Sequence, residues 1–206
     1  MRPLWLAAGL ALAALPGCGP GIPARYVIER DVDGWSYRRY QQVLDVEVAI
    51  EGNAAVGHTA TYVRRATRTG RTVPFVSVFV TAYERPGGLA AEVRRQVRGL
   101  ASYEAEVRDY GGGRLWYLDA GPGDRWVLWV SGQHVVKIGA SEELDAVPEE
   151  LVSAYMGIYS SDLDEHGRAR EGTPSAGAAT EPSGATERPA SGEDDTPQFL
   201  RDNAAR

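Results

Sequence analysis

The stretch EAEVRDYGGGRLWYLDAGPGDRWVLWVSGQHVVKIGA, residues 104–140, decides the fold of this chain. It holds three apolar runs rich in β-branched and aromatic residues, which favour β-strands. YGGGR precedes these runs, and the turn sequences AGPG and SGQH separate them. The Gly-Gln pair inside SGQH suits a two-residue hairpin turn with glycine first. The stretch therefore predicts antiparallel strands joined by tight turns.

The two turns also predict which residues lie opposite each other. The expected pairs are Val130 with Val135, Trp129 with Val136, Val127 with Ile138, Tyr117 with Trp126, and Trp116 with Val127. Both faces of this sheet are apolar, whereas an antiparallel sheet with one wet face alternates. We therefore expect other parts of the chain to cover each face, at least in part.

Three further segments have strand patterns. VLDVEVAIE, residues 43–51, alternates between apolar and polar side chains, which predicts a half-buried strand. HTATYVRRAT, residues 58–67, predicts another strand. VPFVSVFVTAYE, residues 73–84, is apolar on both faces, which predicts a central strand.

Two segments show helical spacing of their apolar residues. One is GGLAAEVRRQVRGLASY, residues 87–103, and the other runs from Pro148 to Tyr159. Proline suits the first helical position, and the two glutamates after it favour the positive end of the helix dipole. The order of strands, helix, strands and helix predicts an α+β domain, an antiparallel sheet with two helices packed on it. This core resembles no named family.

The N-terminus has the pattern of an export signal. One positive charge, Arg2, precedes the 12-residue apolar run LWLAAGLALAAL, and PGC follows that run. The run is too short for a transmembrane helix, which needs about 20 apolar residues. Cleavage at a small-residue site near this point is therefore expected, and Cys18, the only cysteine, stands directly behind the run.

LPGC, residues 15–18, resembles the lipobox of bacterial lipoproteins, in which leucine, a small residue and glycine or alanine precede the cysteine. The resemblance implies cleavage before Cys18, a thioether-linked diacylglycerol on its sulfur and acylation of the new amino group. Gly19 stands where an aspartate is associated with inner-membrane retention in enteric bacteria, so the resemblance implies the periplasmic side of the outer membrane. The alternative is ordinary cleavage nearby, with Cys18 incidental.

Composition divides the chain into four parts. These are a signal peptide at residues 1–17, a lipidated cysteine with a Gly/Pro tether at 18–34, a globular domain at 35–163, and an acidic tail at 164–206. The tail holds no Val, Ile, Trp or Tyr, and such a composition favours disorder. The formal net charge is −6 and neither the domain nor the tail is basic, so we expect no nucleic-acid partner.

The sequence carries no recognisable catalytic or metal-binding motif. His58, His134 and His166 are its only histidines, and no two have the spacing of metal ligands on one element. They are read as polar surface residues, with His58 in a Gly/Ala-rich connection and His134 beside the SGQH turn. YGGGR lacks the Lys-Ser or Lys-Thr of a phosphate-binding loop, and G-x-S-x-G does not occur. We predict no cofactor, metal or catalytic residue, and whether the protein is an enzyme stays open.

Four aromatic residues, Trp116, Tyr117, Trp126 and Trp129, are the most distinctive side chains of the chain. Packing in the core is their default role. The alternative is that some of them line a surface for a peptide, glycan or lipid. The sequence therefore favours a lipid-anchored envelope protein with a binding or interaction domain. The alternatives are an envelope enzyme with an unrecognised site, and an assembly factor that acts through its tail.

Overall fold

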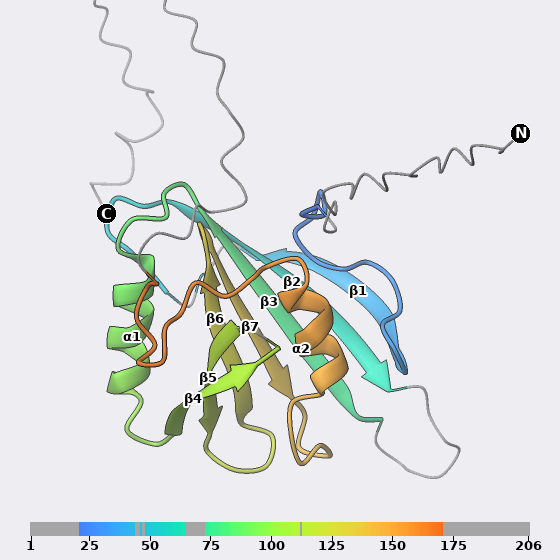
Figure 1. Ribbon diagram of the computed structural model, residues 1–206. Coiled ribbons are helices and arrows are strands. Elements are labelled where there is room, and N and C mark those ends of the chain that lie inside the picture. The colour runs from blue at the N-terminus through green and yellow to red at the C-terminus, as the bar shows by residue number, and fades with distance from the viewer. Residues whose placement is uncertain (1–20, 44–45, 47, 65–72, 112, 171–206) are drawn as a thin grey trace, which may run out of the picture.

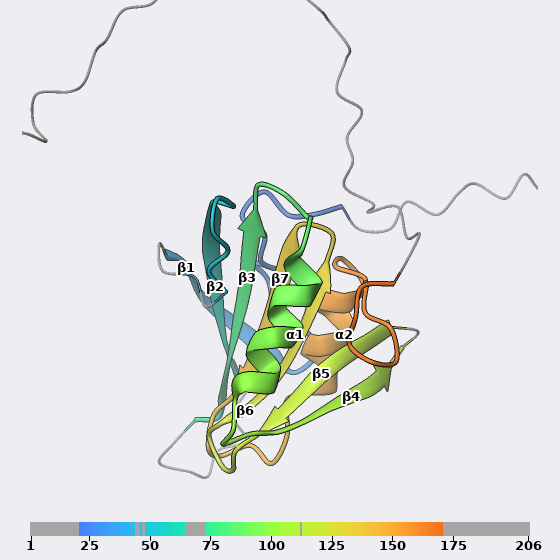
Figure 2. The same cartoon turned by 90° about the vertical axis from the view of Figure 1, so that its left-hand side faces the viewer.

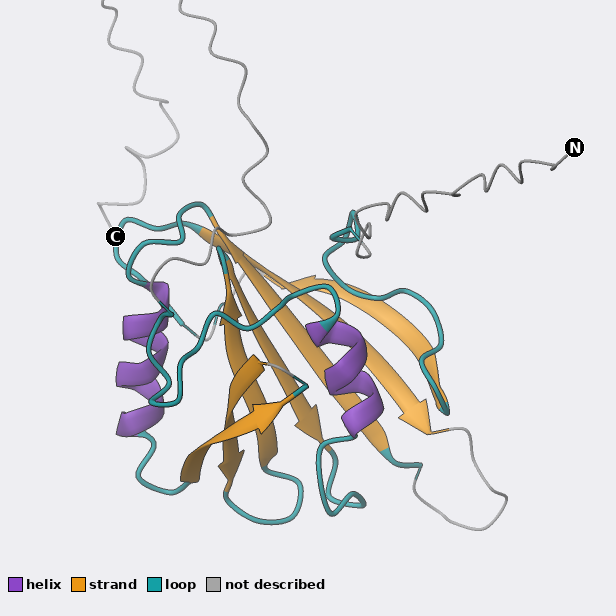
Figure 3. Cartoon of the chain, in the orientation of Figure 1, coloured by secondary structure: helices purple, strands orange, loops and turns teal. Residues whose placement is uncertain are grey.

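A seven-stranded antiparallel sheet carries one helix on each face (Figures 1 and 2). The computed structural model describes residues 21–43, 46, 48–64, 73–111 and 113–170. The elements in chain order are β1 (Trp35–Val43), β2 (Ala55–Arg64), β3 (Phe75–Tyr83), α1 (Leu89–Gly99), β4 (Glu104–Tyr110), β5 (Gly113–Asp119), β6 (Arg125–Ser131), β7 (His134–Ala140) and α2 (Glu149–Met156). The strands lie side by side in the order β1-β2-β3-β7-β6-β5-β4, and Figure 3 shows them as one twisted layer. The predicted α+β class with two helices on an antiparallel sheet is confirmed.

The hairpin between β6 and β7 has the predicted register. Gly132 adopts φ 56° in the two-residue turn, and Ser131 pairs with His134. The three predicted pairs across this turn all form: Val130 with Val135, Trp129 with Val136, and Val127 with Ile138. A two-residue turn leaves one register possible, so the sequence of the turn fixes the pairing of both strands.

The register predicted between β5 and β6 is wrong by one residue. Asp119 pairs with Arg125, so that Tyr117 lies opposite Val127 and Trp116 opposite Leu128. The wider loop is stabilised by the Asp119 carboxylate, which accepts a hydrogen bond from the Gly121 amide at 2.8 Å and one from Arg125 Nε at 3.1 Å. Because side chains alternate along a strand, the one-residue shift exchanges the faces of all the β5 side chains relative to those of β6.

The strand predicted over 43–51 is also wrong. The strand of this region is β1, which ends at Val43, and the described residues that follow it form only an isolated bridge between Ile50 and Asn53. β1 lies at the edge of the sheet, where it pairs with β2 alone. Several of its side chains are therefore exposed, and its sequence lacks the regular apolar alternation that a half-buried strand shows. Residues 44, 45 and 47 lie outside the described residues.

The other predicted elements are found, with shifted ends. β3 is central, between β2 and β7, and its valines Val76, Val78 and Val80 are fully buried. β2 begins before the predicted strand, and the last residues of that prediction, 65–67, lie outside the described part. α1 lies within the predicted helix, whereas α2 ends at Met156, before its predicted end.

The packed domain extends beyond residues 35–163 on both sides. Val27 and Ile28, which the sequence places in the tether, are 1% and 5% exposed and belong to the core. Gly167, which it places in the tail, is buried against the indole of Trp116. Residues 1–20, with the predicted signal peptide and Cys18, and residues 171–206 lie outside the described part of the chain.

Candidate functional site

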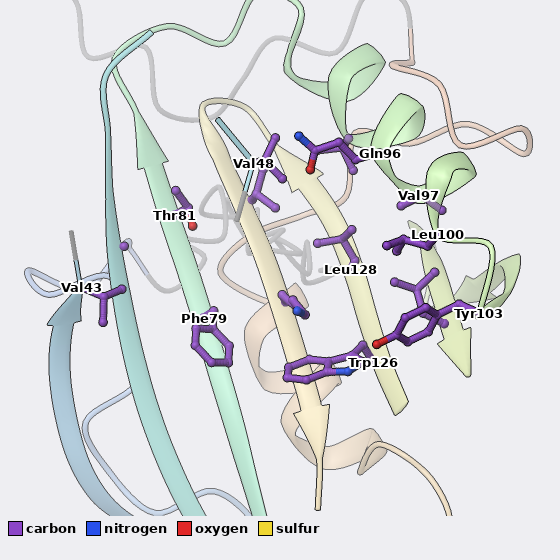
Figure 4. Close-up of a pocket in the computed structure, with 15 residues that line it drawn as sticks. Val43, Val48, Phe79, Thr81, Gln96, Val97, Leu100, Tyr103, Trp126 and Leu128 are labelled. Carbon is purple, nitrogen blue, oxygen red and sulfur yellow. The ribbon is translucent and has the colours of Figure 1, made fainter. Parts of the chain in front are cut away.

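A cavity of about 220 Å³ lies between α1 and the sheet, and we call it the α1 groove (Figure 4). α1 borders it with Val93, Gln96 and Val97, and Leu100, the C-cap residue of the helix, extends this side. The sheet borders it with Phe79, Leu118, Trp126, Leu128, Val135 and Lys137. Alternation along the strands explains this lining. Val78 and Val80, next to Phe79, and Val136, next to Val135, point to the α2 face and are fully buried there.

A carboxylate fixes the aromatic end of the α1 groove. Asp124 Oδ1 accepts a hydrogen bond from Trp126 Nε1 at 2.7 Å and another from the Tyr103 hydroxyl at 2.5 Å. These two bonds, that of Tyr103 above all, lower the pKa of Asp124, which therefore stays ionised and keeps accepting both. Both rings are held at one end of the groove, away from Gln96 (Figure 4).

Lys137, the only lysine of the chain, contributes the cation of the α1 groove. Its Nζ lies 3.7 Å from the centroid of the Trp126 ring and 6.0 Å from that of Phe79, which is cation–π geometry. The other polar side chains of the lining are Thr81, Gln96 and Tyr103. No carboxylate, histidine, serine or cysteine is among the described residues that line it.

The structure separates the four aromatic residues that the sequence grouped. Trp116 and Trp126 lie on the face that α1 covers, whereas Tyr117 and Trp129 lie on the opposite face, because the register of β5 differs from the predicted one. Trp129 is fully buried and donates from Nε1 to the Tyr159 carbonyl at 2.7 Å, and Trp116 is 7% exposed. Of the four, Trp126 alone lines the α1 groove.

The histidine prediction is corrected for two of the three residues. His58 lies within β2 rather than in a connection, and its side chain is buried. His134 does stand beside the SGQH turn, but it too is buried, so neither is a surface residue. Both rings pack against Tyr26, and burial lowers the pKa of both. His166 is exposed, as predicted.

Sequence reasoning missed most of the α1 groove. Phe79 is part of a strand that is apolar on both faces, so its pattern gave no sign that one face borders a cavity. Lys137 carried a usable signal, because a single charge inside the apolar run VVKIG indicates a site where the sheet meets something other than core. Tyr103 carried none, since its role depends on Asp124, 21 residues further along the chain.

The described residues contain neither a metal-binding cluster nor a membrane-spanning helix. No group of three or more His, Cys, Asp or Glu side chains there could hold a metal ion. None of the helices described is both long enough and apolar enough to cross a membrane. Comparison of the chain with protein families, with curated proteins and with solved structures finds no match.

Proposed function

We propose that this protein is a lipid-anchored binding domain of the bacterial cell envelope, and that its α1 groove takes an acyl chain. The observation that carries the proposal is the apolar cavity of about 220 Å³ between α1 and the sheet. Pockets for whole drug-sized ligands are larger, about 300 Å³ or more. The groove therefore suits a narrow apolar chain better than a bulky ligand.

The chemistry of the lining favours an apolar ligand over a glycan. A glycan needs many hydrogen-bonding partners, whereas aliphatic and aromatic side chains make up most of this lining. The same lining favours binding over hydrolysis. Thr81 and Tyr103 are the hydroxyls among its described residues, and no histidine or carboxylate lines the groove beside them. Asp124, which accepts a hydrogen bond from the Tyr103 hydroxyl, has a lowered pKa and is therefore a weak general base.

The LPGC sequence supports the proposed location. Gly21, the first described residue, follows Cys18 by three positions, and three extended residues span about 10 Å. A diacylglycerol on Cys18 together with an acylated amino group would supply the two or more chains that stable anchoring needs. In this proposal the domain is exported and lies on the periplasmic side of the outer membrane, where membrane lipids supply acyl chains.

Quenching of tryptophan fluorescence tests the ligand directly. Dibrominated stearate, kept below its micellar concentration, is added to the mature protein, and unbrominated stearate serves as the reference. Of the tryptophans that the structure describes, Trp126 alone lines the α1 groove, whereas Trp35, Trp116 and Trp129 are buried elsewhere. We expect saturable quenching that the Trp126→Phe variant loses and the matched Trp116→Phe variant keeps.

Two results would contradict the acyl-chain proposal. One is the absence of saturable quenching, and the other is quenching that persists in Trp126→Phe. If a partner protein inserts apolar side chains into the α1 groove instead, cross-linking from the groove rim at Leu100 would capture a protein while stearate stays without effect. Leu100 is 40% exposed and therefore suits a photoreactive substitution.

A further inference from the structure

Three hydrogen bonds that involve tyrosine hydroxyls hold the N-terminal segment, residues 21–28, on the domain. The Tyr159 hydroxyl donates to the Tyr26 carbonyl at 2.7 Å. The Ile28 amide donates to the Tyr155 hydroxyl at 3.0 Å, and the Tyr62 hydroxyl donates to the Ile28 carbonyl. The segment is thus part of the fold, although it lies between the predicted anchor and β1.

Two buried histidines form the surface on which Tyr26 lies. The Tyr26 ring centroid is 4.6 Å from that of His58 and 5.5 Å from that of His134. His58 Nδ1 is 2.9 Å from the Tyr40 hydroxyl, and the His134 ring lies 5.2 Å from that of Tyr159. The segment therefore docks the Tyr26 ring onto a cluster of histidines and tyrosines, next to Val27 and Ile28, which are buried in the core.

Tyr26 adopts a backbone conformation that it would leave if it were free. Its φ is 62°, and it is the only residue other than glycine with a positive φ in the described part of the chain. Such a conformation disfavours a bulky side chain and persists only where surrounding contacts hold it. Docking on the histidine cluster thus holds a local strain that undocking would relieve.

The burial of the His134 ring and the lack of a partner at Nε2 favour its neutral form. A carbonyl can only accept, so Nδ1, which lies 3.3 Å from the Ser131 carbonyl, carries the proton. Nε2 is then a lone pair, and it is buried without a hydrogen-bond partner. Protonation at Nε2 would create a buried N–H⁺ that has no acceptor, which is costly in a desolvated site.

The charged and titratable groups around the cluster do not strongly stabilise a positive charge on His58 or His134. The Arg25 guanidinium lies 5.0 Å from the Tyr40 ring and pairs with Glu29 at 3.4 Å. The Asp162 carboxylate accepts a hydrogen bond from the Gly132 amide of the turn, and no carboxylate is among the groups that shift the pKa of His134. Tyr159 contributes a neutral phenol, because burial raises its pKa.

We propose that His58, His134 and Tyr26 form an acid-released latch, which docks the N-terminal segment at neutral pH and frees it when the histidines are protonated. The direction follows from linkage. Burial lowers the pKa of both histidines in the docked state. For His134 the hydrogen bond to the Ser131 carbonyl opposes this shift in part, and the neighbouring His58 adds to it. The docked state is therefore stabilised above pH 6.5, and this stabilisation is lost as pH falls below that value.

The shift of the docking equilibrium between neutral and acidic pH has an upper limit. A histidine that titrates at about pH 6.5 when undocked and stays neutral when docked shifts the equilibrium about 30-fold toward release at pH 5. Two such residues can multiply that factor. For a chain anchored at Cys18, which is itself part of the proposed function, release would lengthen the tether by about 3.3 Å for each freed residue.

Hydrogen exchange of the full mature chain tests the latch. Protection factors of a peptide covering residues 21–34 are compared with those of the β7 peptide between pH 7.5 and pH 5, after correction for the intrinsic rate. We expect at least a tenfold loss of protection at residues 26–28 and unchanged protection in β7. In the double variant His58→Gln, His134→Gln the loss should disappear, while the exposed control His166→Gln keeps it.

A second variant guards against a misfolded double mutant. Tyr26→Ala removes the docked ring and leaves both histidines in place, so its segment should exchange at pH 7.5 as fast as the wild-type segment does at pH 5. Three results would overturn the latch: no loss of protection in acid, an equal loss in the double variant, or a loss that proceeds in parallel across the segment and β7. Stearate binding is measured separately, so failure of one proposal leaves the other standing.

Discussion

The indole of Trp126 covers Gly139, its cross-strand partner on β7. A β-carbon at Gly139 would lie 2.2 Å from Cζ3 of the ring, so only glycine lets the indole lie this close to the strand. The same ring carries the Lys137 ammonium and donates to Asp124. Gly139 thus positions the side chain that connects the cation, the carboxylate and the apolar wall of the α1 groove.

The Gly139→Ala variant should displace this ring. Overpacking at a buried position costs about 1–3 kcal/mol of unfolding free energy. We expect a loss in that range in urea unfolding, together with weaker quenching by brominated stearate. Gly99→Ala is the matched control, because a β-carbon there meets no atom within 4 Å. Equal stability of the two variants would contradict the close approach of Trp126 to β7.

Truncating the tryptophans one at a time should distinguish a core residue from a groove residue. Trp129 is fully buried and hydrogen-bonded, so Trp129→Ala should cost about 3–5 kcal/mol. Trp126 is only partly buried, so Trp126→Ala should cost clearly less while it abolishes the stearate response. Urea midpoints measured for both variants decide this, and a reversed order of the two costs would contradict the burial of Trp129 and the partial exposure of Trp126.

The hydroxyl of Tyr155 should contribute measurably to stability. In Tyr155→Phe the Ile28 amide loses its acceptor, and an unsatisfied buried donor costs about 1–3 kcal/mol. Tyr117→Phe, which keeps its ring beneath the Arg108 guanidinium, is the control and should change stability by less than about 0.5 kcal/mol. If both variants unfold at the same urea concentration, the buried hydroxyl network is not stabilising.

The same tyrosine predicts a loss of stability in alkali. Burial raises the pKa of Tyr155 well above 10, so the phenol stays protonated in the folded protein while the unfolded chain releases its proton. Stability should therefore fall as pH rises above 10, and it should fall less steeply in Tyr155→Phe. Unfolding free energies measured from pH 8 to pH 11 on both proteins test this, and parallel curves would speak against it.

Deletions at the C-terminus should separate a docked segment from the tail. Composition alone suggests that residues 167–206 are dispensable, but Gly167 packs on Trp116 and the Arg170 amide donates to the Asp162 carbonyl at 2.6 Å. Deleting residues 171–206 should leave the melting temperature within about one degree. Deleting residues 164–206 should lower the melting temperature by several degrees, because each kcal/mol of lost unfolding free energy lowers it by about 2–8 °C. An equal effect of both deletions would contradict docking of residues 164–170.

The anchor has its own test. Cys18→Ser removes the only sulfur that could carry diacylglycerol, so this variant should accumulate as an uncleaved or soluble species, while the wild type partitions into detergent. Mass spectrometry of the mature N-terminus should show a modified cysteine at position 18. A free Cys18, or a mature chain that begins elsewhere, would refute lipidation.

The sequence by itself determined the features that depend on neighbours along the chain. The Gly-Gln turn fixed the register of β6 and β7, because a two-residue turn has room for only one. The apolar spacing of α1 and the apolar run of β3 likewise identified a helix and a central strand. Together they were enough for the α+β class.

Only the tertiary structure decided the features that depend on distant partners. The β5–β6 register depends on which backbone and side-chain groups the Asp119 carboxylate binds, and the one-residue difference moved Trp116 to the same face as Trp126. β1 was missed because an edge strand leaves many of its side chains in water and so carries no clear pattern. His58 and His134 lie 76 positions apart, and they share a buried site with Tyr26 only because β2, β7 and the N-terminal segment meet there. A local pattern reports the periodicity of one segment, whereas a groove or a buried cluster forms where several segments pack against one another.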